Sequence, residues 1–122
     1  ILSQHQGDLE NPTTYDDFEK NIHLFKSLFE FKYADIAYDL HPEYLSTKLA
    51  KTEVDKQKTK SAPVQHHHAH ITSAMVENSI PLAHPRVLGI ALDGLGYGND
   101  KTLWGGEFLL ADYCDFERLA RL

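Results

Sequence analysis

Segments typical of helices alternate with segments typical of strands along this chain, and that alternation limits its possible folds more than any other feature. From Tyr15 to Phe29, apolar side chains recur at steps of three and four residues, which predicts a helix with one apolar stripe. Val87–Leu92 is almost wholly apolar, as expected of a strand covered on both faces. We therefore predict an α/β domain with a hairpin near its end.

Shorter signals predict the remaining elements. Thr14, with Asp17 three residues on, is the expected cap of the first helix. The lysine-rich stretch 52–62 is expected to be a loop, and the glycine-rich segment Asp93–Asp100 is expected to be a turn. The other expected elements are strands at 33–38, 63–65 and 102–113, and helices from 42 to about 49 and from 66 to about 78.

Charge and cysteine content exclude several classes of protein. The formal net charge of −6 argues against a nucleic-acid partner held by bulk electrostatics. The single cysteine, Cys114, excludes an internal disulfide framework and fits a reducing cytoplasm. The apolar runs are too short to span a membrane, and no signal peptide is recognisable. Because the chain begins at Ile1 without a methionine and its last element has no closing signal, we expect a fragment of a longer protein.

A cluster of histidines lies between His66 and His70. If this segment is helical, these two residues lie four positions apart on one face, where their ring nitrogens can bind one ion. Ser73 and Glu77 continue this polar face, and the expected buried face is formed by His67, Ile71, Ala74 and Met75. Histidine pairs at this spacing also arise by chance, so a structural pair is the alternative.

Asp93 strengthens the metal-binding interpretation. It follows a buried strand, where carboxylates are rare unless they bind something or are otherwise paired. Two imidazoles and one carboxylate form a common ligand set for Zn²⁺ or Fe²⁺ that leaves positions open for a substrate. The pattern predicts a metal centre of His66, His70 and Asp93, with a cap of the glycine-rich turn as the alternative role for Asp93.

Glycines recur in the two segments that follow the apolar strand. Alternate glycines let backbone amides approach an anion closely, although a tight hairpin uses glycine in the same way. A glycine pair within a strand would admit a ligand or another backbone. Glu107 directly follows that pair, and it is either a catalytic carboxylate or an ordinary half-exposed strand residue. The predicted cofactor-binding glycines are Gly94, Gly96, Gly98, Gly105 and Gly106.

Five short motifs in series cover nearly the whole chain and together resemble the TsaD-like part of HypF-type carbamoyltransferases. Each motif is short, but five in this order are specific. At Leu95 the sequence departs from the family, which usually has threonine there, so the resemblance does not extend to any hydroxyl contact with a ligand at this position. The motifs are SQHQGDLE at 3–10, DLHPEYLST at 39–47, VQHHHAHI at 64–71, ALDGLGYG at 91–98 and WGGE at 104–107.

The resemblance implies an α/β fold of the actin, Hsp70 and sugar-kinase type (ribonuclease H-like), in which two lobes close on a nucleotide. Residues 1–80 would form the end of the first lobe, and residues 81–122 the start of the second. The resemblance also implies a metal ion bound by His66, His70 and Asp93, with a further ligand outside this chain. We take Asp93 and Glu107 as the candidate catalytic residues.

Enzymes of this family form carbamoyl-adenylate from carbamoyl phosphate and ATP. They then pass the carbamoyl group to the C-terminal cysteine of HypE, for the cyanide ligands of nickel–iron hydrogenases. The resemblance therefore implies part of a cytoplasmic carbamoyltransferase of hydrogenase maturation, inactive as an isolated piece. The alternatives are an O-carbamoyltransferase or tRNA threonylcarbamoyl transferase of the same fold, and a non-catalytic segment that binds metal or docks a partner.

Overall fold

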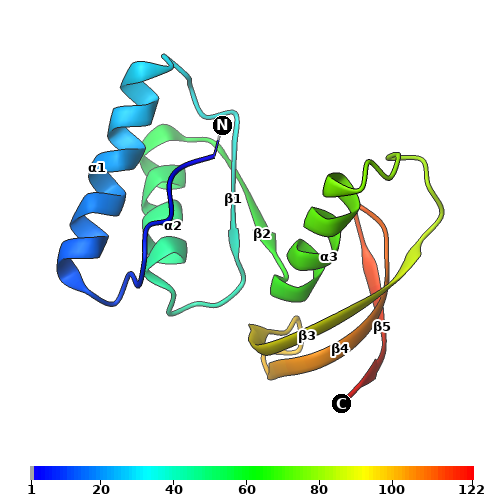
Figure 1. Ribbon diagram of the computed structural model, residues 1–122. Helices are drawn as coiled ribbons and strands as arrows, with labels where there is room; N and C mark the ends of the chain where they lie inside the picture. The colour runs from blue at the N-terminus through cyan, green and yellow to red at the C-terminus, as the bar shows by residue number, and fades with distance from the viewer. Residues whose placement is uncertain (1) are drawn as a thin grey trace. The chain divides into compact units, whose positions relative to one another are not determined.

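The computed structural model describes residues 2–122, which form three helices and five strands (Figure 1). They divide into two compact units. The first comprises the residues up to Tyr38 together with Pro42–Ala62, and the second comprises Asp39–His41 together with Pro63–Leu122. The predicted mixed α/β class is confirmed, whereas the division into lobes at residue 80 stays a prediction about the complete protein. Among residues 2–122, no helix has the length and apolar character that a membrane span requires.

Helix α1, Pro12–Leu28, belongs to the first unit and begins earlier than expected. Asn11 is its N-cap, because its side-chain oxygen accepts hydrogen bonds from the N–H groups of Thr13 and Thr14 at 2.9 and 3.3 Å. Pro12 occupies the first turn, where its missing N–H is not needed. The helix is confirmed, but the predicted cap of Thr14 and Asp17 is wrong.

Helix α2, Leu45–Gln57, runs through half of the stretch that was expected to be a loop. Lysine and glutamine are good helix formers, so the run of lysines does not interrupt the helix. The helix ends where Lys58 adopts a left-handed conformation with φ of 52°. The rest of the stretch forms β2, Lys60–Val64, which pairs with β1, Asp35–Asp39, in a two-stranded sheet. The predicted loop at 52–62 is therefore wrong.

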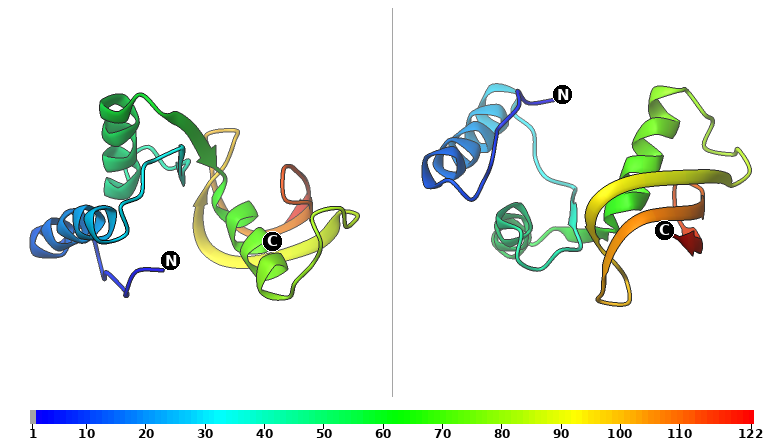
Figure 2. Two further views of the ribbon diagram at one scale, coloured as in Figure 1. Left: turned by 90° about the horizontal axis from the view of Figure 1, so that it is seen from above. Right: turned by 60° about the horizontal axis from the view of Figure 1, so that its bottom comes forward.

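The second unit packs helix α3, His66–Glu77, against a three-stranded antiparallel sheet. The strands lie in the order β3, β4, β5, and Figure 2 shows β3 and β4 curving around α3. Only one hairpin was expected here, so the third strand is an addition to the predicted fold. The strand bounds are Val87–Tyr97 for β3, Leu103–Ala111 for β4 and Phe116–Arg121 for β5.

Strand β3 continues through most of the predicted glycine-rich turn. Leu92 pairs with Gly106 and Gly96 pairs with Trp104, so residues 93–95 of β3 stand opposite the single residue between those partners on β4. This irregularity is a bulge, which re-aims side chains without ending the strand. The actual turn lies beyond it, where the N–H of Gly98 donates to the carbonyl of Thr102 at 2.8 Å.

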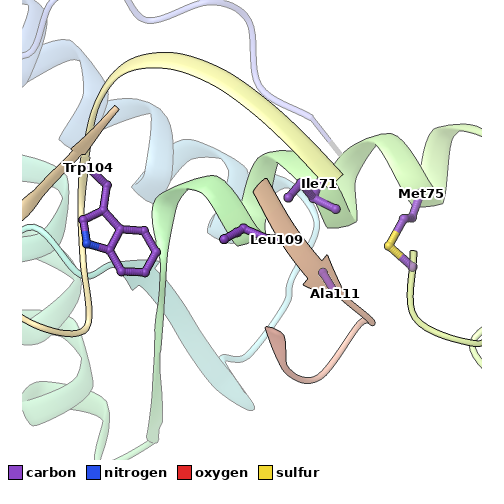
Figure 3. Packing of buried hydrophobic residues seen from close by; sticks show 5 residues of the cluster. All are labelled: Ile71, Met75, Trp104, Leu109 and Ala111. Atoms are coloured by element: carbon purple, nitrogen blue, oxygen red, sulfur yellow. The ribbon is translucent and has the colours of Figure 1, made fainter. Parts of the chain in front are cut away.

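The core of the second unit lies between α3 and the sheet. Figure 3 shows Ile71 and Met75 of α3 beside Leu109 and Ala111 of β4, with Trp104 farther along the same strand. All five side chains are buried. Helix α3 is thereby held against the sheet by apolar packing, which fixes the position of its polar face.

Gly89 of β3 lies directly beneath Ile71, so replacing it with alanine should destabilise the second unit. A Cβ atom at Gly89 would stand 2.6 Å from Cγ1 and 2.8 Å from Cγ2 of Ile71. Such overpacking costs about 1–3 kcal/mol of unfolding free energy. Urea unfolding of Gly89→Ala should report this loss, and Gly94→Ala is the control because a Cβ there meets no atom within 4 Å. Equal stability of the two variants would contradict the packing described.

Candidate metal centre

His66 and His70 lie on one face of α3, as predicted, and their Nε2 atoms are 3.2 Å apart. The first turn that carries His66 is fixed by Gln65, whose side-chain oxygen accepts the N–H of His68 at 2.9 Å. His66 is half-buried and His70 is exposed. The helix therefore presents the pair of imidazoles away from the core.

The opposite face of α3 is buried, with one exception to the prediction. Ala74 was expected on the buried face and is exposed, whereas His68 is buried instead. His68 is held there because its Nε2 atom lies 2.7 Å from the backbone carbonyl oxygen of Asp112. The buried residues of the helix are His67, His68, Ile71 and Met75.

Asp93 faces the histidine pair from the bulge of β3. Its Oδ2 atom lies 2.8 Å from Nε2 of His66 and 3.3 Å from Nε2 of His70. Its Oδ1 atom accepts the N–H of Gly94 at 2.7 Å. The geometry is compatible with both roles considered for Asp93, because one oxygen accepts the N–H of Gly94 and the other faces the imidazoles.

The spacing of these three donor atoms fits a divalent ion. They form a triangle with sides of 2.8, 3.2 and 3.3 Å. Ligands at about 2.0–2.1 Å in a tetrahedral arrangement lie about 3.3 Å from one another, so little movement would be needed. The side chain of His70 is 60% exposed, which leaves one side open to a further ligand. The donor set has the chemistry and the spacing of an open zinc or iron site.

Asp39 is a fourth participant that the sequence reasoning missed. Its Oδ2 atom lies 2.6 Å from Nδ1 of His66, on the side of the ring that faces away from Asp93. Asp39 belongs to the second unit with α3 and β3, although it is the last residue of β1. The sequence pointed to Asp39 only through its place in the motif Asp-Leu-His-Pro. No local periodicity relates Asp39 to His66, which lies 27 residues later in the chain.

The carboxylates around His66 change its affinity for protons. Burial lowers the pKa of His66, but the hydrogen bonds and charges of Asp39 and Asp93 outweigh burial, and the net pKa is raised. Burial raises the pKa of Asp93, but the Gly94 N–H and the two histidines outweigh it, and the net pKa is lowered. In the metal-free chain, the stability contributed by protonated His66 is present below about pH 6.5 and is lost as the pH rises through the raised pKa.

As the pH falls, binding of a divalent ion should therefore begin to weaken at a higher pH than it would with histidines of unshifted pKa. The ion needs unprotonated Nε2 on His66, and the raised pKa keeps a proton there above about pH 6.5. Zn²⁺ titrations from about pH 8 to pH 6 should show the affinity falling roughly tenfold per unit below that pKa. The His66→Ala, His70→Ala double variant is the control, since its residual binding belongs to other groups. An affinity independent of pH over this range would contradict the prediction.

Glu107, a predicted catalytic residue, lies in β4 with its carboxylate buried and fully engaged. Its side chain is 1% exposed, and Nε and Nη2 of Arg118 each donate to one of its oxygens at 2.6 Å. Arg118 also stacks on the ring of Trp104, 4.1 Å from the ring centre. These contacts favour a structural role for Glu107, while its catalytic role stays an untested prediction.

The predicted cofactor-binding glycines have different surroundings. Three of them lie against side chains: a Cβ at Gly96 would meet Nδ1 of His67 at 2.7 Å, one at Gly98 would meet Trp104, and one at Gly106 would meet Leu122. By contrast, Gly94 is open, and Gly105 has only the carbonyl of Asp93 nearby, at 3.8 Å. The glycines with room for a ligand are therefore the two beside Asp93.

Two known protein families match this chain, each over a separate part of it. Residues 1–77 match the HypF Kae1-like domain, and residues 89–122 match the second subdomain of the carbamoyltransferase Kae1-like domain. The chain is 43% identical over 121 residues to carbamoyltransferase HypF of Synechocystis. The aligned region covers 99% of this chain and 15% of that protein. It is 38% identical to carbamoyltransferase HypF of Rhodobacter capsulatus, covering 100% of this chain and 16% of that protein.

Solved structures agree with these matches. The crystal structure of full-length HypF in the phosphate- and nucleotide-bound form is similar at a TM-score of 0.86 and 41% identity, covering 97% of this chain and 18% of that one. The crystal structure of T. kodakarensis HypF is also similar at a TM-score of 0.86. The sequence identity is 40%, and the match covers 98% of this chain and 15% of that one. The chain therefore spans about a sixth of the length of these relatives. It belongs to the HypF carbamoyltransferase family.

Proposed function

We propose that this chain supplies part of the carbamoyl-transfer site of a HypF enzyme, in which His66, His70 and Asp93 hold one divalent ion, Zn²⁺ or Fe²⁺. The convergence of two imidazole nitrogens and one carboxylate oxygen within 3.3 Å of one another carries the proposal. The family membership supports it, because the relatives are named carbamoyltransferases. No observation favours the tRNA enzyme, the O-carbamoyltransferase or a non-catalytic segment.

The chemistry expected at this centre is acyl transfer to a thiol. A bound ion supplies Lewis acidity toward a carbamoyl or phosphate oxygen. Asp93 orients the site from β3, because the Gly94 N–H holds one of its oxygens while the other faces the histidines. Gly94 and Gly105 leave space in which backbone groups can approach a phosphate. The nucleophile comes from the acceptor, since none of the residues gathered here is a thiol or an activated hydroxyl.

In the complete protein, ATP and carbamoyl phosphate would give carbamoyl-adenylate, with pyrophosphate and phosphate released. The sulfur of the HypE C-terminal cysteine then bonds to the carbamoyl carbon, and AMP leaves. A similar full-length HypF was solved in a phosphate- and nucleotide-bound form, which supports the use of a nucleotide by the complete protein. The proposal includes a two-lobed, actin-like arrangement with residues 1–80 in the first lobe, a cytoplasmic location, and a role in making the cyanide ligands of nickel–iron hydrogenase. Carbamoylation of the HypE thiol by the complete protein, before and after replacement of Asp93, tests it.

A further inference from the structure

Asp39 contacts its surroundings through both carboxylate oxygens. Oδ2 lies 2.6 Å from Nδ1 of His66, and Oδ1 accepts the N–H of His41 at 2.7 Å. The side chain is 20% exposed, so both contacts are shielded from water. At this distance, a hydrogen bond between an imidazole N–H and a carboxylate is short and charge-assisted. Asp39 therefore holds the His66 ring from behind, opposite the side that faces Asp93.

We propose that Asp39 is a positioning residue of the metal centre: it accepts a hydrogen bond from the Nδ1–H of His66 and thereby leaves Nε2, which faces His70 and Asp93, as the nitrogen that binds the ion. A carboxylate only accepts hydrogen bonds, so Nδ1 beside Asp39 carries a proton; Nε2 beside Asp93 carries one as well when His66 is protonated, and an ion would displace only this Nε2 proton. In a neutral imidazole the other nitrogen then has a free lone pair, which is the form that binds a metal. This inference rests on the proposed function, because it assigns Asp39 to the same centre.

The local turn does not by itself require this arrangement. The His41 N–H donates a hydrogen bond to Oδ1 of Asp39, a contact that shapes the segment following β1. The backbone N–H of Leu40 also donates to the carbonyl of Val64 at 3.1 Å, which ties this segment to β2 independently of the carboxylate. The second oxygen of Asp39 contacts His66, which lies outside this turn.

Measuring the Zn²⁺ affinity of the complete protein, in wild type and in Asp39 variants, tests the proposal. Competition with a chromophoric chelator gives the affinity, and the binding that persists in the His66→Ala, His70→Ala double variant is subtracted. Asp39→Ala should weaken Zn²⁺ binding by about 10–100-fold. Asp39→Asn should fall between wild type and Asp39→Ala, because its one amide oxygen can accept from either the His41 N–H or the Nδ1–H of His66 but not from both. With Co²⁺ in the site, the visible absorption spectrum should change in Asp39→Ala and stay closer to wild type in Asp39→Asn.

Asp112→Ala is the matched control, because the Asp112 carboxylate also accepts backbone N–H groups in a turn, those of Cys114 and Asp115 at 2.8 Å. It should leave the Zn²⁺ affinity unchanged. If Asp39→Ala lowers the melting temperature but leaves the affinity and the Co²⁺ spectrum of wild type, Asp39 only shapes its turn and the proposal is overturned. If the histidine double variant itself binds Zn²⁺ like wild type, the metal centre fails, which is a separate result.

Discussion

Replacing Asp93 with alanine should lower the rate of carbamoyl transfer to the HypE thiol by roughly a thousandfold or more, which corresponds to about 4 kcal/mol of transition-state stabilisation. The substitution removes the oxygen that lies 2.8 and 3.3 Å from the two histidine nitrogens. With one of the three ligands that this chain supplies removed, the centre would hold the ion and the reacting group poorly. Formation of carbamoyl-adenylate should persist, because we assign that step to a domain outside this chain.

Two readouts separate these steps. Mass spectrometry of HypE reports the transferred carbamoyl group, and pyrophosphate release reports adenylate formation. Asp115→Ala is a suitable control, since its carboxylate is 70% exposed and pairs with Arg86. Normal modification of HypE by Asp93→Ala would mean that Asp93 has no part in the transfer. Loss of both steps together would instead point to a general defect in folding.

Replacing Arg118 with methionine should have the largest effect on stability, about 3–5 kcal/mol of unfolding free energy. The substitution leaves the carboxylate of Glu107 buried at 1% exposure without its two N–H donors. The side chain of Arg118 is itself only 24% exposed, so water can replace it poorly. Urea unfolding measures the loss. Arg86→Met, which breaks an exposed pair with Asp112 and Asp115, should change stability little.

A double variant, Glu107→Leu with Arg118→Met, should recover most of that stability, since a buried ion pair can often be replaced by apolar side chains of similar volume. The same variant decides the role of Glu107. If the residue is structural, the refolded double variant should retain transfer to HypE. A stable double variant that has lost transfer would support the catalytic role predicted from the sequence. A double variant no more stable than the single one would contradict the ion-pair argument.

The sequence was sufficient for the parts of the site that depend on local periodicity. His66 and His70 share a face because they are four residues apart in a helix, and the helix from 66 to about 78 was predicted from the sequence. The strand before Asp93 followed from its apolar composition. What spacing could not supply was the meeting of α3 and β3, which depends on tertiary packing of Ile71 over Gly89. The expectation that Asp93 joins the histidines came from the family resemblance and from its position after a strand that was expected to be covered on both faces. In the described residues one face of this strand is exposed, at Leu88, Ile90 and Leu92.

The errors have identifiable physical causes. The glycine-rich segment was expected to turn, but its backbone continues the ladder with β4 and forms a bulge, which sequence composition does not distinguish from a turn. The lysine-rich stretch was expected to be a loop because of its charge, although lysine is compatible with a helix. The pairing of Glu107 with Arg118 depends on β5, a strand that was not predicted. Asp39 was missed because its partner is distant in the sequence.

An anomalous difference map from crystals of the complete protein soaked with Zn²⁺ would test most directly whether the three side chains bind one ion. Data recorded above and below the zinc absorption edge identify the element. We predict a peak about 2.0–2.2 Å from Nε2 of His66, Nε2 of His70 and Oδ2 of Asp93. A map at saturating Zn²⁺ with no peak there, and with the imidazoles still hydrogen-bonded to Asp93, would contradict the metal centre.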